Sequence, residues 1–80
     1  MVYYVYMLEC RDGSLYTGIA IDVVRRVKEH NESPRAAKYT RSRRPVKLLR
    51  KERFMTRSNA QKREAAIKRL PRKEKLALIG

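Results

Sequence analysis

The chain has 80 residues, enough for one domain with a modest core, and carries 21 lysine and arginine residues against 8 aspartate and glutamate residues. A formal net charge of +13 at pH 7 favours a polyanionic partner, and nucleic acid is the simplest one. The single cysteine, Cys10, excludes an internal disulfide and a cysteine-based zinc cluster, and we expect it to be a small buried hydrophobe.

The start of the chain predicts a β-hairpin. Residues 2–9 (VYYVYMLE) and 14–19 (SLYTGI) are rich in valine and tyrosine, as strands are. Between them, Asp12-Gly13 is a strong signal for a two-residue hairpin turn. We expect Gly18 to end the second strand.

A helix is expected next, running from Asp22, which is placed to cap it, to about Glu32. Its valines recur at helical spacing but have poor helix propensity, so tertiary packing must hold the helix together. Ser33-Pro34 breaks it. Residues 35–44 (RAAKYTRSRR) have no clear period, and this predicts a basic loop.

The second half of the chain predicts one strand and two helices. A third strand, only partly alternating, is expected over residues 46–54. Ser58, with Gln61 three positions on, resembles a capping box that opens a helix ending before Pro71. A last short helix beginning at Pro71 is expected to turn three apolar side chains inward, namely Leu76, Leu78 and Ile79.

These elements predict the α+β class. We expect a small three-stranded antiparallel sheet flanked by helices, in the order β-β-α-β-α-α. The sequence contains no internal repeat and no domain boundary, so residues 1–80 are expected to form a single domain.

Four side chains of the hairpin and the first helix are candidates for one catalytic surface. Tyr6 and Tyr16 lie ten positions apart across the turn, and Arg26 and His30 share one helix face. The tyrosines could instead be cross-strand packing on an exposed sheet face, where a Tyr→Phe change costs little stability. Arg26 could be solvated or paired with Asp22. His30 could be a surface residue near the helix C-terminus, which favours its cation.

Glu64 is the only acid on a helix crowded with lysine and arginine, and it shares the expected core face with Ala60 and Ile67. One interpretation is a surface ion pair with Lys68, four residues on. The other is a carboxylate at the rim of the core that binds one Mg²⁺ or Mn²⁺, since these ions often use only one or two carboxylates.

The basic loop also has two interpretations. Runs of charge are usually solvated and mobile, but in this strongly cationic chain we expect phosphate contacts. Tyr39 could stack on a base, as aromatic side chains do in single-strand binders. The predicted nucleic-acid-binding residues are Arg35, Lys38, Tyr39, Arg41, Arg43, Arg44 and Lys68.

Taken together, these residues resemble the GIY-YIG nuclease superfamily. The residues that carry the resemblance are Tyr4-Val5-Tyr6, Tyr16-Thr17-Gly18, Arg26, His30 and Glu64. The chain looks closest to the small, single-domain bacterial members of that superfamily (UPF0213-like). In those members three segments recur in the same order, LYTGI…D…RR…H, KYTRSRRPV and REAAIKRL. The resemblance covers almost the whole chain.

The resemblance implies a metal-dependent endonuclease that hydrolyses DNA phosphodiester bonds by a one-metal, in-line mechanism. In such a site Glu64 would hold one Mg²⁺ or Mn²⁺, and Arg26 would neutralise the scissile phosphate. Tyr16 or Tyr6 would take a proton from the attacking water, which requires a phenol pKa lowered by nearby cations. His30 would assist this proton transfer or orient the phosphate.

Two other classes remain open. One is a nucleic-acid-binding module on the same fold with little or no cleavage, supported by the small size of the chain. The absence of the asparagine that follows the glutamate in several superfamily members also supports it. The other is an RNA- or ribosome-associated basic protein, supported by composition alone.

We expect a monomeric protein whose partner is nucleic acid, DNA ahead of RNA. We expect it in the cytoplasm with no membrane partner, because no signal peptide or membrane-length apolar run is visible.

Overall fold

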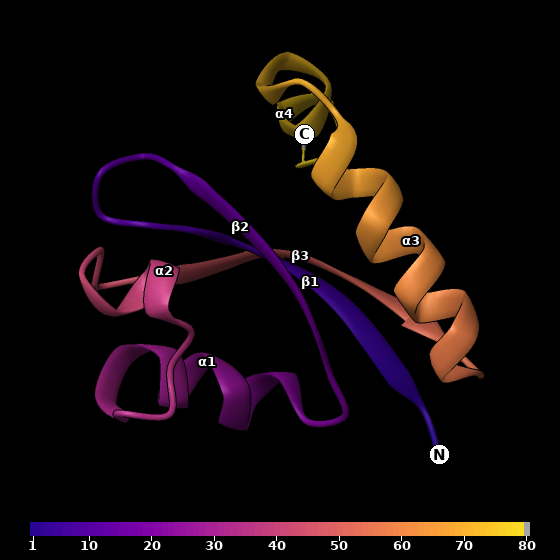
Figure 1. The fold of residues 1–80 in the computed structure, drawn as a ribbon, viewed down its shortest axis with the longest axis horizontal. Coiled ribbons are helices and arrows are strands. Elements are labelled where there is room, and N and C mark those ends of the chain that lie inside the picture. The colour runs from indigo at the N-terminus through magenta and orange to yellow at the C-terminus, as the bar shows by residue number, and fades with distance from the viewer. Residues whose placement is uncertain (80) are drawn as a thin grey trace.

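The computed structural model describes residues 1–79, and over that range one antiparallel sheet carries four helices (Figure 1). The elements in chain order are β1 (Tyr3–Glu9), β2 (Leu15–Ala20), α1 (Val23–Glu32), α2 (Lys38–Arg41), β3 (Lys47–Phe54), α3 (Arg57–Arg69) and α4 (Arg72–Ile79). The strand order is β2-β1-β3, and both neighbours of β1 run antiparallel to it. The predicted α+β class and the order of the long elements are confirmed.

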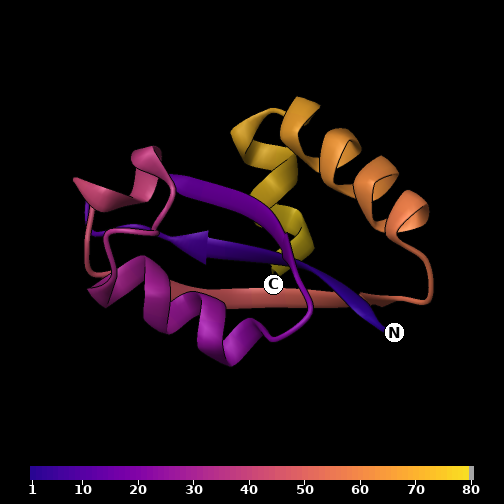
Figure 2. The same ribbon diagram turned by 60° about the horizontal axis from the view of Figure 1, so that its bottom comes forward.

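The central strand β1 is buried on both faces because helices cover both sides of the sheet. Helix α1 lies against one face, and α3 with α4 lies against the other (Figure 2). Alternate residues of β1 serve the two layers, with Tyr6 and Leu8 packing on the α1 side and Val5 and Met7 on the α3 side. Cys10 is buried at the end of this strand, as the sequence predicts.

The hairpin turn forms at Asp12-Gly13 as predicted. Gly13 has a φ of +84°, a conformation that glycine adopts without steric cost, and Asp12 accepts hydrogen bonds from Ser14. The expectation that Gly18 ends the second strand is wrong. Gly18 lies inside β2, directly opposite Tyr6, and a Cβ atom there would lie 2.5 Å from the Tyr6 hydroxyl oxygen.

Residues 35–44 are not entirely a loop. They contain the single helical turn α2, in which Thr40 donates from Oγ1 and Arg41 from its backbone N–H to the Ala37 carbonyl. One turn of helix is unstable in isolation. Contacts with the end of α1 stabilise this turn. The residues of the segment show no helical period from which the turn could be predicted.

Helix α3 begins earlier than the capping box predicted. Its N-cap is Thr56, whose side chain accepts a hydrogen bond from the Asn59 N–H, so Ser58 and Gln61 both lie inside the helix. Thr56 and Ser58 can both cap a helix and lie two positions apart. The spacing of the sequence alone does not show which of them is the N-cap. The predicted cap of α1 at Asp22 is confirmed, with Asp22 accepting from the Arg25 N–H.

A bidentate ion pair fixes α3 to the sheet. Arg63 donates to both carboxylate oxygens of Glu52 on β3, at 2.7 and 3.1 Å. In α4, Leu78 and Ile79 pack against the core as expected, but Leu76 is exposed, so that part of the prediction is wrong. None of the helices in residues 1–79 is long and apolar enough to span a membrane.

Gly18→Ala is expected to destabilise the protein by about 1–3 kcal/mol, because the new methyl group must displace a buried tyrosine ring. Urea unfolding of the parent and the variant gives the change. An unchanged unfolding midpoint would mean that the Tyr6 ring can move aside freely.

Candidate active site

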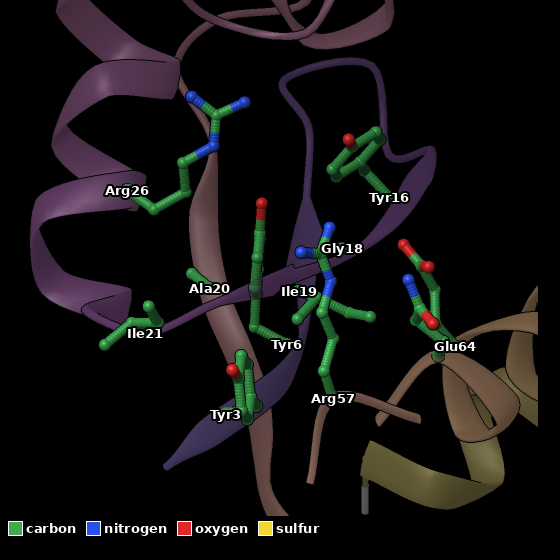
Figure 3. A pocket seen from close by; sticks show the side chains of 11 residues that line it. Tyr3, Tyr6, Tyr16, Gly18, Ile19, Ala20, Ile21, Arg26, Arg57 and Glu64 are labelled. Atoms are coloured by element: carbon green, nitrogen blue, oxygen red, sulfur yellow. The ribbon is translucent and has the colours of Figure 1, made fainter. Parts of the chain in front are cut away.

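A hollow of about 480 Å³ opens at the edge strand β2, between α1 on one side and α3 on the other. Figure 3 shows Arg26 and Glu64 approaching it from these opposite sides, with Tyr6 and Tyr16 between them. The structure therefore brings together four of the five predicted catalytic residues at this hollow. Its lining residues are Tyr3, Tyr6, Tyr16, Gly18, Ile19, Ala20, Ile21, Arg26, Arg57, Gln61 and Glu64.

The two tyrosines meet because of the strand register. Tyr6 pairs with Gly18, so Tyr16 lies diagonally across from it on the same sheet face, with ring centroids 6.4 Å apart. Since Gly18 has no side chain, the Tyr6 ring fills the space above it. The expectation of an exposed sheet face is wrong for Tyr6, which is only 1% exposed because α1 covers it.

Arg26 is held within α1 and by the segment that follows it. Its Nη1 donates to Glu29 Oε1 at 3.0 Å and to the Arg35 carbonyl at 3.1 Å. The alternative of a salt bridge to Asp22 is wrong, since the Asp22 side chain caps the helix instead. These two hydrogen bonds, together with partial burial, give the Arg26 guanidinium a defined position at the wall of the hollow.

His30 is fully buried, so the interpretation as a surface residue is wrong. Its Nε2 lies 2.8 Å from the Tyr6 hydroxyl, and its Nδ1 lies 2.7 Å from Thr40 Oγ1. Burial lowers the pKa of His30 to about 4, and the positive charges of Arg26 and Arg44 add to this effect. The imidazole is therefore neutral at physiological pH.

The phenol of Tyr6 is protonated at physiological pH. The pKa of Tyr6 is raised to about 12, mainly by burial and to a lesser extent by the nearby Tyr16 and Glu64, while Arg26 opposes them. The requirement that cations lower the phenol pKa is thus not met at Tyr6. A neutral phenol hydrogen-bonded to a neutral imidazole is the resting state of the pair.

Glu64 forms the ion pair of the first interpretation and lies at the hollow, while the metal-binding interpretation stays a prediction. Its carboxylate pairs with Lys68 at 3.3 Å, and the same side chain lines the hollow. Ala60 and Ile67 are buried beside it, as the helix face predicted. Within residues 1–79, no three His, Cys, Asp or Glu side chains form a metal-binding group. Glu64 is the one carboxylate among the residues that line the hollow, a donor set that suits Mg²⁺ because it retains several waters.

Two lining residues of α3 were missed at the sequence level. Arg57 and Gln61 precede Glu64 by seven and three positions, so one helix face carries all three to the hollow. Helical spacing from Glu64 would have found them. Arg57 adds a second cation to a hollow that already contains Arg26.

The basic segment contains two arginines that bind within the protein. Arg44 donates to the carbonyls of His30 and Ser33 at the end of α1. Arg43 donates to Asp12 in the hairpin turn at 3.1 Å, and its guanidinium lies 4.0 Å from the Tyr39 ring centroid. These contacts hold the segment against α1 and the hairpin.

Tyr39 packs against Tyr16 of β2. Its ring stacks on Tyr16 with centroids 6.1 Å apart and an interplanar angle of 25°. Tyr16 also contacts the edge of the His30 ring, at 5.2 Å between centroids. The remaining predicted contacts, Arg35, Lys38, Arg41 and Lys68, are exposed, and the last three line hollows beside Tyr39.

The family described as "GIY-YIG catalytic domain" matches residues 2–77. The chain belongs to the GIY-YIG family. A UPF0213 protein of Desulfotalea psychrophila is 51% identical over 77 residues, which cover 96% of this chain and 70% of that one. A UPF0213 protein of Syntrophus aciditrophicus is 53% identical over 76 residues, which cover 95% of this chain and 87% of that one.

Two solved structures are similar to this GIY-YIG chain. The solution NMR structure of a UPF0213 protein from Bacillus halodurans has a TM-score of 0.64 at 46% identity, over 99% of this chain and 83% of that one. A solution NMR structure of a protein from E. faecalis has a TM-score of 0.65 at 49% identity, over 94% of this chain and 79% of that one. The resemblance found in the sequence is confirmed.

The stability of this GIY-YIG domain should fall as the pH falls from about 6.5 towards 4. In that range the unfolded chain protonates its only histidine while folded His30 stays neutral, and the full effect is roughly 3 kcal/mol. Urea unfolding at pH 7, 6 and 5 should show roughly 2 kcal/mol of this loss. His30→Gln is the control, and its stability should change little over the same range.

The carboxylates act at lower pH, because the pKa values of Asp12, Glu29 and Glu52 lie below their ordinary values. Their stabilising contributions are lost only as the pH falls through those lowered pKa values. Equal stability of the parent at pH 7 and pH 5 would contradict a buried neutral imidazole.

Proposed function

We propose that this chain is an endonuclease that hydrolyses DNA phosphodiester bonds with one bound divalent ion. The single observation that carries the proposal is the hollow at β2, where a guanidinium, two phenols and a carboxylate converge from β1, β2, α1 and α3. These groups are the ones needed to bind a phosphate, move a proton and hold a cation. Membership of the GIY-YIG family supports the same reaction class.

Glu64 would hold the ion, Mg²⁺ or Mn²⁺, at the α3 side of the hollow. When bound, a divalent ion stabilises negative charge that develops on phosphate oxygens. Lys68 pairs with the Glu64 carboxylate, and its ammonium group would contact a phosphate oxygen of the substrate beside the ion that Glu64 would hold. A half-buried carboxylate at the edge of the hollow is accessible enough to bind the ion.

Arg26 would bind the scissile phosphate from the α1 side. Its Nη1 is anchored to Glu29 and the Arg35 carbonyl, which fixes the plane of the guanidinium. A planar fork of donors suits two oxygens of one phosphate, and Arg57 supplies a second positive charge at the same hollow. Together they offset the charge of the bound diester.

The Tyr6–His30 pair would remove the proton of the attacking water. The Tyr6 oxygen accepts this proton while its own proton passes to His30 Nε2, 2.8 Å away, and the water oxygen forms a bond to phosphorus. The bond from phosphorus to the leaving ester oxygen breaks in the same step, and that oxygen takes a proton from solvent, while the imidazolium of His30 later returns its proton to solvent through Tyr6. Because the pKa of Tyr6 is about 12, a free phenolate is unfavourable at neutral pH. Tyr6 must therefore pass its own proton to His30 as it accepts the proton of the water. A bound phosphate would screen Arg26, whose charge lowers the pKa of His30, and make the imidazole a stronger base.

A track of three hollows supports nucleic acid as the substrate. The catalytic hollow shares Tyr16 with a second hollow of about 340 Å³, which Lys68 and Lys75 line, and the second shares Tyr39 with a third. The third is lined by Lys38, Tyr39, Arg41, Ser42 and Arg43. Cations and aromatic rings along one path are typical of surfaces that follow a nucleic-acid backbone. Lys75 of α4 joins the predicted contacts.

A binding module with little cleavage is the second candidate. The observation that favours it is the single carboxylate of the hollow, already paired with Lys68, in a described range without a three-residue metal-binding group. A pure binder should hold DNA equally well in chelator and with Mg²⁺, and should cleave it in neither. Divalent-dependent cleavage therefore separates the two candidates.

Glu64→Gln is expected to lower cleavage by about 100-fold or more, because the amide keeps the size of the side chain but binds a divalent ion poorly. DNA binding should stay equal or become slightly tighter, since a negative charge is lost. Cleavage of labelled DNA with Mg²⁺ and Mn²⁺ measures the first effect, and binding in chelator measures the second. The control is Glu74→Gln, on the exposed first turn of α4. Equal cleavage by the parent and Glu64→Gln would remove Glu64 from the reaction.

Lys75→Ala should weaken DNA binding and reduce the slope of log K against log salt by about 1, the value expected for one lost phosphate contact. Lys73→Ala is the matched control, because Lys73 is exposed on the same helix and lines none of the three hollows of the track. Fluorescence anisotropy in chelator, from 50 to 200 mM salt, compares the two. Equal slopes for both variants would place the DNA elsewhere on the surface.

A further inference from the structure

Thr40 is a fully buried polar residue to which the proposed reaction gives no role. It lies on the single turn α2, in the middle of the basic segment, and its Oγ1 is 2.7 Å from His30 Nδ1 and 3.0 Å from the Ala37 carbonyl oxygen. A threonine hydroxyl has one proton, so it can donate to only one of these two neighbours. Which neighbour receives that proton decides the state of the imidazole.

Counting protons along the chain of hydrogen bonds gives one arrangement that makes every bond. Thr40 donates to the Ala37 carbonyl, which can only accept, so Thr40 Oγ1 accepts from His30 Nδ1–H. Nε2 of the neutral ring then carries no proton and accepts from the Tyr6 hydroxyl. All three contacts are satisfied, in agreement with the absence of any unpaired buried side-chain nitrogen or oxygen in residues 1–79.

The opposite tautomer makes fewer bonds. If His30 carried its proton on Nε2, Thr40 would have to donate to Nδ1 and would lose its bond to Ala37. Tyr6 would accept from His30, and its own proton would need another acceptor. Arg26, which lies close to this hydroxyl, is a donor and cannot take it.

We propose that Thr40 is a positioning residue that fixes His30 in the Nδ1–H tautomer and so keeps Nε2 free to accept the Tyr6 proton. Its effect on cleavage rests on the proposed function, whereas its effect on the tautomer does not. The hydroxyl also stabilises the imidazolium that forms during proton transfer, because it still accepts from Nδ1–H at that moment. The basic segment thus contributes a buried group to the reaction in addition to its surface charges.

The tautomer can be measured directly because the chain has one histidine. In the ¹⁵N-labelled protein at pH 7, two-bond ¹H–¹⁵N correlation spectra distinguish a protonated ring nitrogen from an unprotonated one. The parent should show a protonated Nδ1 and an unprotonated Nε2. An Nε2–H tautomer in the parent overturns the proposal without any variant, so the test does not depend on whether variants fold.

Two variants then separate the hydroxyl from the shape of the side chain. Thr40→Val keeps the shape and removes the acceptor, so the proton should move to Nε2 in a large fraction of molecules. Thr40→Ser keeps the oxygen and should retain the Nδ1–H tautomer. A Thr40→Val protein that folds and keeps the parent tautomer overturns the proposal.

Kinetics give the second readout. Thr40→Val should lower kcat by about 10- to 100-fold with little change in KM, as expected when the group that orients a catalytic histidine is lost. Thr40→Ser should recover most of that loss. Equal kcat values for the parent and Thr40→Val would also overturn the proposed role of Thr40 in positioning His30. If the parent has the Nδ1–H tautomer but cleaves no DNA, the proposed function fails while the assignment of the tautomer stands.

Discussion

The hydrogen-bonded chain from Tyr6 through His30 to Thr40 is the interaction on which the arrangement of the site depends. It links the central strand, the first long helix and the single turn α2 inside the core. Buried polar groups of this kind are costly unless each finds a partner, so the three elements must pack in one relative position. That position holds the Tyr6 hydroxyl at the inner wall of the hollow and keeps the imidazole neutral.

The edge of the sheet gives this buried pair access to a substrate. Because β2 has no strand on its outer side and Gly18 has no side chain, the Tyr6 ring reaches the edge where Tyr16 lies. Charged groups arrive from both helical layers, Arg26 from one and Glu64 from the other. Glu64 directly follows Arg63, which the ion pair with Glu52 ties to β3, so the sheet also sets the place of the carboxylate.

Local patterns were enough to predict the class, the order of the strands and long helices, and four of the residues that converge at the hollow. They missed Arg57, Gln61 and the one-turn helix α2. They were not enough to predict burial, since alternation shows which side of a strand Tyr6 faces but not that α1 covers that side. The direction of the pKa change at Tyr6 was wrong for that reason. Thr40 could not be found, because no spacing in the sequence relates a one-turn helix to a histidine ten residues earlier.

The central claim is that water attacks phosphorus in line while Tyr6 and His30 only move its proton. The most direct test is the stereochemistry of cleavage at a phosphorus made chiral with sulfur and oxygen isotopes. One in-line displacement by water inverts the configuration, and this is the predicted result. Retention would mean that a side chain, such as a tyrosine, first forms a covalent bond to phosphorus, and it would contradict the role assigned to the Tyr6–His30 pair.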